Sequence, residues 1–397
     1  MILEPPRAGE AAPSPVAWLR GAHLPVRWPI KKIKYLAQLA AGVSITSESI
    51  SPTGAFPVYG ANGLRGFTTG FTHAGVQVLV GRQGALCGNV HLADGRFWAS
   101  EHAIVVTPGV GVDARWLAYL LRVMNLGQYS VATAQPGIAA GVVANLDAHV
   151  PSHHEQRQMA DFLDREVAKI DALIAKQENL IEVLRQRERA IYDQRLLFPE
   201  DARSTSMRRV LKKLDRPARL AGEVVTVYRD GAVTLRSKRR AAGYTESAEA
   251  AGYQGIKQGD LAFHGLDGFA GAVGISDSDG IASPVYHVCV PRAGDSPEYL
   301  ALLLRQLGLA GYLTAQGNSV RQRSVDFRNW AVFGRVPLEL PDVSIQRAVV
   351  AELTAKTAQT AKVIAKTECF IELSKERRLA LITAAVTGQI DVEGAAA

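Results

Sequence analysis

The 397-residue sequence has few cysteines and no long apolar run, and both absences exclude classes of protein. Its three cysteines, Cys87, Cys289 and Cys369, are odd in number and too far apart for a CxxC metal site, so we expect small buried thiols in a reduced, cytoplasmic protein. No apolar run approaches the roughly 20 residues of a membrane span. The N-terminus lacks a basic segment followed by an apolar one, so we expect no secretory signal, and we interpret residues 1–22 as a disordered lead.

Motifs of common catalytic sites are also missing. The sequence has no GxxxxGK(S/T) phosphate loop, no Asn/Asp-Pro-Pro-aromatic sequence of the kind that amino-methyltransferases use, no GxSxG elbow and no evident PD…ExK nuclease core. The segment GVGVD at 109–113 lacks the full dinucleotide fingerprint and follows a proline, which favours a turn. The sequence therefore predicts a chain without a catalytic site.

The charge balance is modestly basic, with a formal net charge of +7. Basic clusters lie at residues 31–34, 208–213 and 236–240. A single cluster of this kind is most often a solvated face. Because such clusters occur in both halves of the chain, the sequence permits a polyanionic partner.

The main feature that is present is a long internal repeat. Residues 151–191 align without a gap on residues 341–381, at an offset of 190. Because this period has the size of a domain, it indicates two copies of one large unit and not a solenoid of short repeats. Identical pairs include Pro151/Pro341, Gln156/Gln346, Arg157/Arg347, Leu163/Leu353, Ile174/Ile364, Lys176/Lys366, Glu178/Glu368, Ile181/Ile371, Glu182/Glu372 and Arg187/Arg377.

Both copies of the repeat are predicted to be long helices. Neither proline nor glycine occurs in residues 152–198 or 342–387, so nothing interrupts the helical hydrogen bonds there. Ser152 and Glu155 form a capping box at the start of the first copy, and Gly388 stands where a C-cap glycine belongs after the second.

Apolar residues recur near heptad spacing along both predicted helices, opposite charged faces. A helix of ~40 residues at ~1.5 Å per residue is roughly 60 Å long, and an apolar stripe of that length needs a partner helix, for which the other copy is the obvious candidate. The residues predicted to form this antiparallel coiled coil are Phe162, Ile170, Leu173, Leu180, Leu184, Ile191, Leu353, Val363, Phe370 and Leu381.

The segments before the two helices are rich in glycine, valine and short alternating runs, which are typical of mixed α and β structure. We therefore predict an α+β protein with a pseudo-twofold internal repeat, in which two mixed α/β domains are carried at opposite ends of a stiff rod. The predicted boundaries are 1–22 for the lead, 23–150 for the first domain, 151–197 for the first helix, 198–340 for the second domain, 341–390 for the second helix and 391–397 for a tail.

A cluster before the first helix could suggest a metal site, since it contains His149, His153, His154 and Glu155. The matching positions of the second copy are Glu339, Val343, Ser344 and Ile345. Because the second copy of the repeat lacks this cluster, we interpret the cluster as a solvated helix start and expect no metal.

Three segments carry a resemblance to a known family. The helix FLDREVAKIDALIAKQENLIEVLRQRERAI resembles the first conserved region of specificity subunits of type I restriction–modification systems, and ERRLALITAAVTGQIDV at 376–392 is similar to the end of their second conserved region. Residues 56–106 look like a target-recognition domain of that family. The likeness extends over nearly the whole chain from about residue 23, although the second domain departs more.

This resemblance implies a non-catalytic, DNA-reading subunit that takes part in phage defence. Each domain would read one half of a bipartite, asymmetric site in double-stranded DNA, and the paired helices would set the gap and dock two modification (methyltransferase) subunits. Restriction (translocase-nuclease) subunits would join that complex. S-adenosylmethionine and ATP would be bound by these partners, and no cofactor is expected in this chain.

Polar residues in glycine-flanked, loop-like stretches are our candidates for DNA contacts, because a backbone can approach DNA there. In the first domain they are Asn62, Arg65, Arg82, Gln83 and His102. In the second they are Arg236, Lys238, Arg239, Lys257, Arg321, Gln322 and Arg323. Each of these residues is about as readily an ordinary polar residue of a surface loop.

Two other functions remain open from the sequence. One is a two-headed scaffold that binds proteins and has no role with DNA, against which the +7 charge is weak evidence. The other is a catalytic nuclease or methyltransferase, which the missing motifs disfavour. Salt-dependent binding to DNA distinguishes the scaffold from a DNA-reading subunit, and activity of the purified chain alone would indicate an enzyme.

Overall fold

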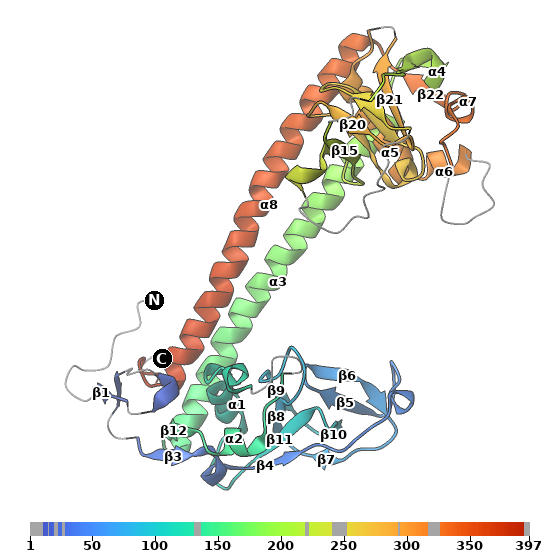
Figure 1. The fold of residues 1–397 in the computed structure, drawn as a ribbon. Helices are drawn as coiled ribbons and strands as arrows, with labels where there is room; N and C mark the ends of the chain where they lie inside the picture. The colour runs from blue at the N-terminus through green and yellow to red at the C-terminus, as the bar shows by residue number, and fades with distance from the viewer. Residues whose placement is uncertain are drawn as a thin grey trace. The chain divides into compact units, whose positions relative to one another are not determined.

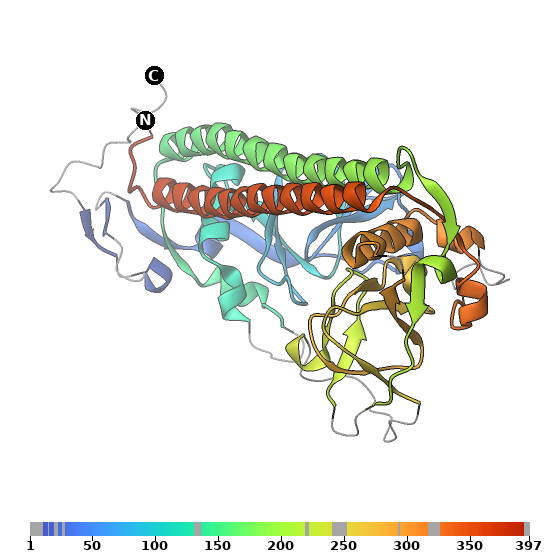
Figure 2. The same cartoon turned by 90° about the horizontal axis from the view of Figure 1, so that it is seen from above.

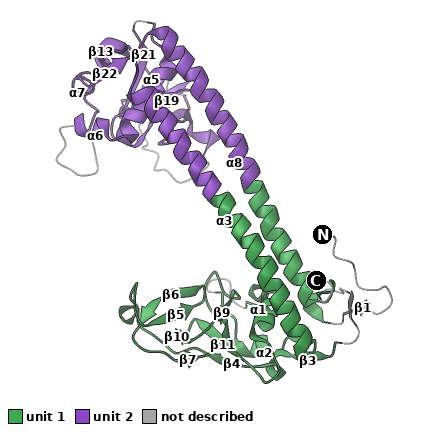
Figure 3. Ribbon diagram, turned by 180° about the vertical axis from the view of Figure 1, so that it is seen from behind, with its two compact units in different colours: residues 1–178, 368–397 green, residues 179–367 purple. Residues whose placement is uncertain are grey.

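The computed structural model describes residues 11–14, 16–19, 23–25, 28–130, 136–218, 222–239, 252–292, 294–316 and 326–392. The chain divides into two compact units, which Figure 3 distinguishes by colour. Unit 1 comprises residues 1–178 and 368–397, and unit 2 comprises residues 179–367. Each of the two long helices contributes one part to each unit.

Two four-stranded sheets form the β structure of unit 1 (Figure 1). The first has the order β4-β11-β8-β9 and is antiparallel throughout; its strands are Ala37–Ala41, Ala103–Pro108, Gln77–Gly81 and Val90–Ala93. The second has the order β6-β5-β10-β7, with strands Gly63–Thr68, Phe56–Gly60, Arg96–Ala99 and His73–Ala74, and its β5 and β10 are parallel. Two antiparallel pairs accompany them: β1 (Ala11–Pro13) with β2 (His23–Pro25), and β3 (Ile30–Lys32) with β12 (Asp147–His149).

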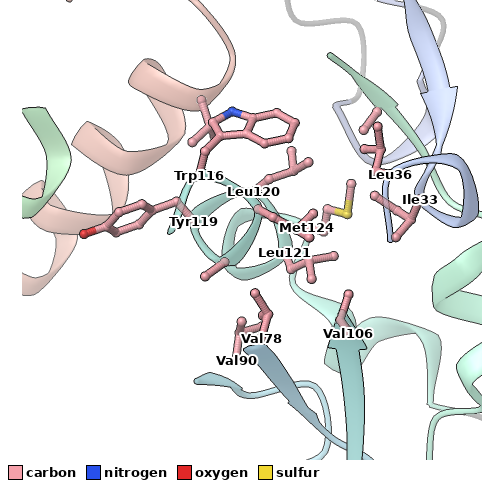
Figure 4. Close-up of a cluster of buried hydrophobic side chains, with 14 of the residues drawn as sticks. Ile33, Leu36, Val78, Val90, Val106, Trp116, Tyr119, Leu120, Leu121 and Met124 are labelled. Atoms are coloured by element: carbon pink, nitrogen blue, oxygen red, sulfur yellow. The ribbon is translucent and has the colours of Figure 1, made fainter. Parts of the chain in front are cut away.

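Helix α1 (Ala114–Val123) holds the first sheet of unit 1 to the rest of that unit. Asp113 caps it by accepting hydrogen bonds from the backbone of Arg115 and Trp116. Figure 4 shows Leu121 of α1 towards Val78, Val90 and Val106 of the strands beneath it, with Trp116 on the opposite side of the helix. Trp116 is fully buried in this core, and burying each such apolar side chain stabilises the unit by about 1.5–3 kcal/mol. Helix α2 (Ala140–Ala144) follows, and α3 (His153–Leu197) begins immediately after β12.

Unit 2 repeats the strand order of unit 1. Its antiparallel sheet has the order β14-β21-β18-β19, with strands Leu211–Lys213, Tyr286–Pro291, Leu261–His264 and Val273–Ile275. Its second sheet has the order β16-β15-β20-β17, with strands Val233–Leu235, Val224–Val227, Gly280–Ala282 and Gln254–Ile256, and β15 and β20 are parallel. The internal repeat of the sequence is therefore also a repeat of the fold.

The helices of unit 2 follow the same plan. Helix α5 (Pro297–Leu309) is capped by Ser296 and carries the buried Tyr299 at the position that Trp116 holds in α1. The remaining elements are β13 (Arg203–Ser206), which pairs with β22 (Pro337–Leu340), and the helices α4 (Met207–Val210), α6 (Tyr312–Gln316), α7 (Trp330–Phe333) and α8 (Val343–Val386).

Within unit 1, the first part of α3 packs against the last part of α8, and Figures 1 and 2 both show them side by side. Phe162 and Leu163 share a core with Ile382, and further along Arg378 forms an ion pair with Asp171. Residue numbers therefore rise along one helix as they fall along the other, which makes the pair antiparallel.

Within unit 2, the last part of α3 packs against the first part of α8. The Tyr192 hydroxyl lies 2.8 Å from the Thr357 hydroxyl, and Arg195 pairs with Glu352 at 2.8 Å. Leu353 lies in the buried apolar cluster of unit 2 against which Tyr192 packs. This pair is antiparallel too, so the predicted α+β fold with two long packed helices is correct.

The residues of the helix contact differ in part from the predicted stripe. Phe162 and Leu353 are buried, and Ile170, Leu184, Ile191 and Leu381 are half-buried. Four predicted members instead remain 39–42% exposed, namely Leu173, Leu180, Val363 and Phe370. The buried positions of the contact in this region are Ile174, Ile181, Thr367, Ile371 and Ser374. Ile174, Ile181 and Ile371 each directly follow a predicted residue, whereas Thr367 and Ser374 lie four residues after Val363 and Phe370.

In the part of the chain that the structure describes, no helix combines the length and the apolar character that crossing a membrane requires.

Candidate nucleic-acid interface

The five candidate residues of unit 1 come from three neighbouring segments. The β5–β6 turn touches the end of β8, because a Cβ at Gly81 would lie 2.3 Å from the carbonyl oxygen of Ala61. Only glycine permits that approach. Asn62 is exposed in this turn and accepts a hydrogen bond of 3.0 Å from the Asn89 side chain. Arg65 is exposed on β6, and its side chain lies against Gly60.

Arg82, Gln83 and His102 form one connected group. The Arg82 N–H donates to the His102 carbonyl at 2.8 Å, and the Arg82 carbonyl accepts from the Ile138 N–H at 2.9 Å. The Gln83 amide oxygen lies 3.0 Å from Nδ1 of His102. All three side chains are half-buried, so their positions are restricted while one edge of each stays accessible. The structure thus brings these predicted residues together.

The sequence prediction did not include two residues of the same patch, Asn89 and His91. Nε2 of His91 is buried without a partner, and the ring lies about 3 Å from where a Cβ at Gly63 would stand. Burial, together with Arg122, lowers the pKa of His91, which keeps the ring neutral near pH 7. The alternation of β9 could not have indicated His91, because His91 lies on the same face of the strand as the buried Ala93.

The candidates of unit 2 lie among carboxylates. Arg239 pairs with Asp230, which lowers the pKa of that carboxyl group, and its guanidinium stacks over Tyr228 at 4.5 Å. Lys238 lies 3.4 Å from Asp277. Such exposed pairs contribute only about 0–1 kcal/mol, so a phosphate could displace the carboxylates.

The other candidates of unit 2 are less connected. Arg236 is half-buried in the short turn after β16, and Lys257 is exposed next to Asp260, whose carboxylate accepts from the Lys257 N–H at 2.7 Å. Arg321, Gln322 and Arg323 lie outside the described residues.

The loop that carries Arg82 and Gln83 has a counterpart in unit 2 with other side chains. There the Gly265 N–H donates to the Val285 carbonyl at 3.0 Å, and the Gly265 carbonyl accepts from the Phe327 N–H at 2.8 Å. These bonds match those of Arg82 with His102 and Ile138. Gly265, Leu266 and Val285 therefore stand where unit 1 has Arg82, Gln83 and His102, so the two loops offer different chemistry to a ligand.

A second surface lies on the long helices. Large apolar side chains remain exposed there at positions that differ by 190 residues, as in the sequence repeat. On α3 they are Leu173, Leu180 and Val183, and on α8 they are Val363, Phe370 and Leu373. Exposed apolar residues gathered on one element indicate a contact with another molecule.

A groove of about 1120 Å³ lies within unit 2 beside α5. Arg305 of α5 lines it, and Nε of this side chain is buried without a hydrogen-bond partner. Arg122 is its counterpart in α1 of unit 1, where Nε donates to the Val90 carbonyl at 3.2 Å. The two equivalent arginines therefore differ in hydrogen bonding, since Nε of Arg122 has a partner and Nε of Arg305 has none.

Among the described residues, no group of three or more His, Cys, Asp or Glu side chains is placed to hold a metal ion.

Comparisons with known proteins agree with this architecture. Residues 25–183 match the family model described as the type I restriction modification DNA specificity domain. The chain is 36% identical over 167 residues to the EcoprrI specificity subunit of Escherichia coli, an alignment that spans 38% of this chain and 42% of that protein. A putative type I restriction enzyme specificity subunit of Haemophilus influenzae is 26% identical over 120 residues, spanning 30% of this chain and 31% of that protein. The alignments thus cover less than half of the length of these curated relatives.

Two solved structures share the fold. A chain from a study of complex assembly and conformational transition of the type I R-M system covers 93% of this chain and all of its own length, at 14% identity and a TM-score of 0.62. The HsdS subunit of Thermoanaerobacter tengcongensis covers 94% of this chain and 99% of its own, at 13% identity and a TM-score of 0.53. Residues 25–183 of this chain are thus similar to type I restriction modification DNA specificity domains.

Proposed function

We propose that this chain is the non-catalytic subunit that gives a type I restriction–modification complex its DNA sequence specificity. Residues 23–150 and 198–340 act as target-recognition domains, and each reads one half of a bipartite site in double-stranded DNA. The complex acts in the cytoplasm in phage defence, and S-adenosylmethionine and ATP bind to its other subunits. The EcoprrI subunit, a protein of this kind by name, supports the proposal.

One observation carries the proposal most directly: the two units have the same strand order but unlike loops. Arg82, Gln83 and His102 supply donors and acceptors of the kind that read base edges in the major groove. The equivalent loop of unit 2 has Gly265 and Leu266. Two recognition domains that share a fold but carry chemically different loops are suited to an asymmetric DNA site, whose two halves differ in sequence.

The proposed partners of the long helices are two modification subunits. The α3–α8 contact is not purely apolar, because Thr367 and Ser374 are buried in it. Meanwhile Leu173, Val183 and Leu373 stay exposed on the outside. Amphipathic helices of a partner would cover these side chains, and the offset of 190 residues supplies two similar surfaces.

An exchange of domains tests the proposal. Residues 23–150 are replaced by the corresponding domain of a related subunit, and the methylated sites are read by methylome sequencing in cells with the modification subunit. We expect one half of the site to change while the other half and the gap stay the same. A change of both halves would refute the proposal. If the complex bound no DNA at any salt concentration, the chain would be a protein-binding scaffold.

A further inference from the structure

The first turn of each long helix contains a buried glutamine that joins the helix to the neighbouring globular domain. In unit 1, the Gln156 side chain accepts a hydrogen bond of 2.9 Å from the Asp113 N–H and donates one of 3.0 Å to the Pro151 carbonyl. Asp113 is the N-cap of α1, which covers the first sheet. Gln156 is 2% exposed. One side chain thus links the start of α3 to the start of α1.

Unit 2 contains the same junction, and there the glutamine also contacts an aspartate–arginine ion pair. The Gln346 side chain accepts 2.9 Å from the N–H of Ser296, the N-cap of α5, and donates 2.9 Å to the Pro341 carbonyl. It also donates 2.7 Å to the carboxylate of Asp295, which pairs with Arg203 of β13. Gln346 is fully buried.

A carboxamide is the side chain that suits this position. It must accept from a backbone N–H and donate to a backbone carbonyl at the same time, which also fixes the orientation of the amide. A glutamate could accept but not donate, and it would place a buried charge against the proline carbonyl. A methionine would keep the volume and lose both bonds. The pairs Pro151/Pro341 and Gln156/Gln346 are identical in the two copies of the repeat.

We propose that Gln156 and Gln346 are positioning residues that set the orientation of each recognition domain on its helix, and through it the gap between the half-sites. The inference rests on the proposed function. A rotation of about 8° across a domain of roughly 25 Å moves its far side by ~3.5 Å, close to the rise of one base pair. Small changes at the junction are therefore enough to alter the gap by one base pair.

The test uses Gln156→Met and Gln346→Met in the full chain, assembled with its modification subunit. Gln389→Met, at an exposed position after α8, is the control. We expect each junction variant to keep both half-sites but to methylate additional sites whose gap differs by one base pair. The rate at the original gap falls roughly ten-fold, because a buried polar pair is lost. Methionine keeps the volume of glutamine but cannot form its hydrogen bonds. An unchanged gap with an unchanged rate would therefore overturn the inference, because it would show that only packing matters at this position.

Hydrogen exchange provides a readout that does not depend on DNA. In Gln156→Met the Asp113 amide is expected to exchange at least roughly ten-fold faster, while the Ser296 amide of unit 2 is unchanged, and Gln346→Met is expected to show the reverse. Unchanged exchange at both amides would also overturn the inference. If the unaltered complex modified no defined sequence, the proposed function would fail, whereas the exchange rates would still decide whether the junction exists.

Discussion

Leu373 and Ile371 are two residues apart on α8 but should affect different properties of the protein. Ile371 is 5% exposed in the contact with α3, whereas Leu373 is 57% exposed. We expect Ile371→Ala to lower the free energy of unfolding and Leu373→Ala to weaken binding of the modification subunit. Val183, which is 49% exposed, is the repeat mate of Leu373 and serves as the matched variant for the second surface.

The magnitudes follow from these exposures. Truncation of a buried isoleucine to alanine costs about 2–5 kcal/mol of unfolding free energy. Full burial of a leucine is worth about 1.5–3 kcal/mol, so covering the exposed part of Leu373 by a partner contributes about 1–1.5 kcal/mol, or roughly ten-fold in Kd. Alanine favours the helix, so Leu373→Ala should change the stability of the free chain by less than about 0.5 kcal/mol.

Two measurements separate these effects. Urea unfolding of the free chain gives the change in stability, and biolayer interferometry with the purified modification subunit gives the change in Kd. The reasoning is refuted if Leu373→Ala destabilises the free chain as much as Ile371→Ala and leaves the Kd for the partner unchanged. That result would place Leu373 in the internal packing of the chain.

Three further predictions concern single side chains. Burial lowers the pKa of His287 below its ordinary value of 6.5, so below about that pH the unfolded chain takes up a proton that the folded chain does not. The free energy of unfolding should therefore fall as the pH drops below about 6.5. Urea unfolding of His287→Phe should show a flatter pH profile. Burial raises the pKa of Cys289 to about 12, so iodoacetamide should label the exposed Cys369 first and Cys289 only after unfolding, as peptide mass spectrometry can show; equal rates would contradict the structure. Gln83→Ala should relax base preference in one half-site only, and altered preference in both halves on methylome sequencing would count against a separate reading domain.

The long helices could be predicted from sequence, whereas the residues of their contact could only partly be. Uninterrupted helical sequence and capping residues indicated the two helices. The predicted stripe followed the largest apolar side chains, including Phe370. The structure buries Thr367 and Ser374 instead, and their hydroxyls donate to the carbonyls of Val363 and Phe370 at 2.9 and 2.8 Å. Because these local bonds satisfy the hydroxyls, a polar residue becomes compatible with burial, which a hydropathy pattern does not register.

The sheets and the candidate site depend on contacts between distant residues. The parallel pairing of β5 with β10 joins segments about 40 residues apart, and no local pattern specifies it. Likewise, Lys238 and Arg239 stand out in sequence as part of a basic run, but Asp277 and Asp230 neutralise them across the fold. Gln83 and His102 were both predicted as candidates for DNA contacts, but the contact between them was not predicted.

The match between the loops at Arg82 and Gly265 indicates how one fold can present two different surfaces. Both loops are held by the same two backbone hydrogen bonds, which any residue except proline can make. Their side chains are therefore free to differ without loss of the loop. At the junctions the opposite holds, because the bonds there need the side chains of Gln156 and Gln346. Under the proposed function, substitutions in the loops should thus alter which bases are preferred, whereas substitutions at the junctions should alter the orientation of the two domains on their helices.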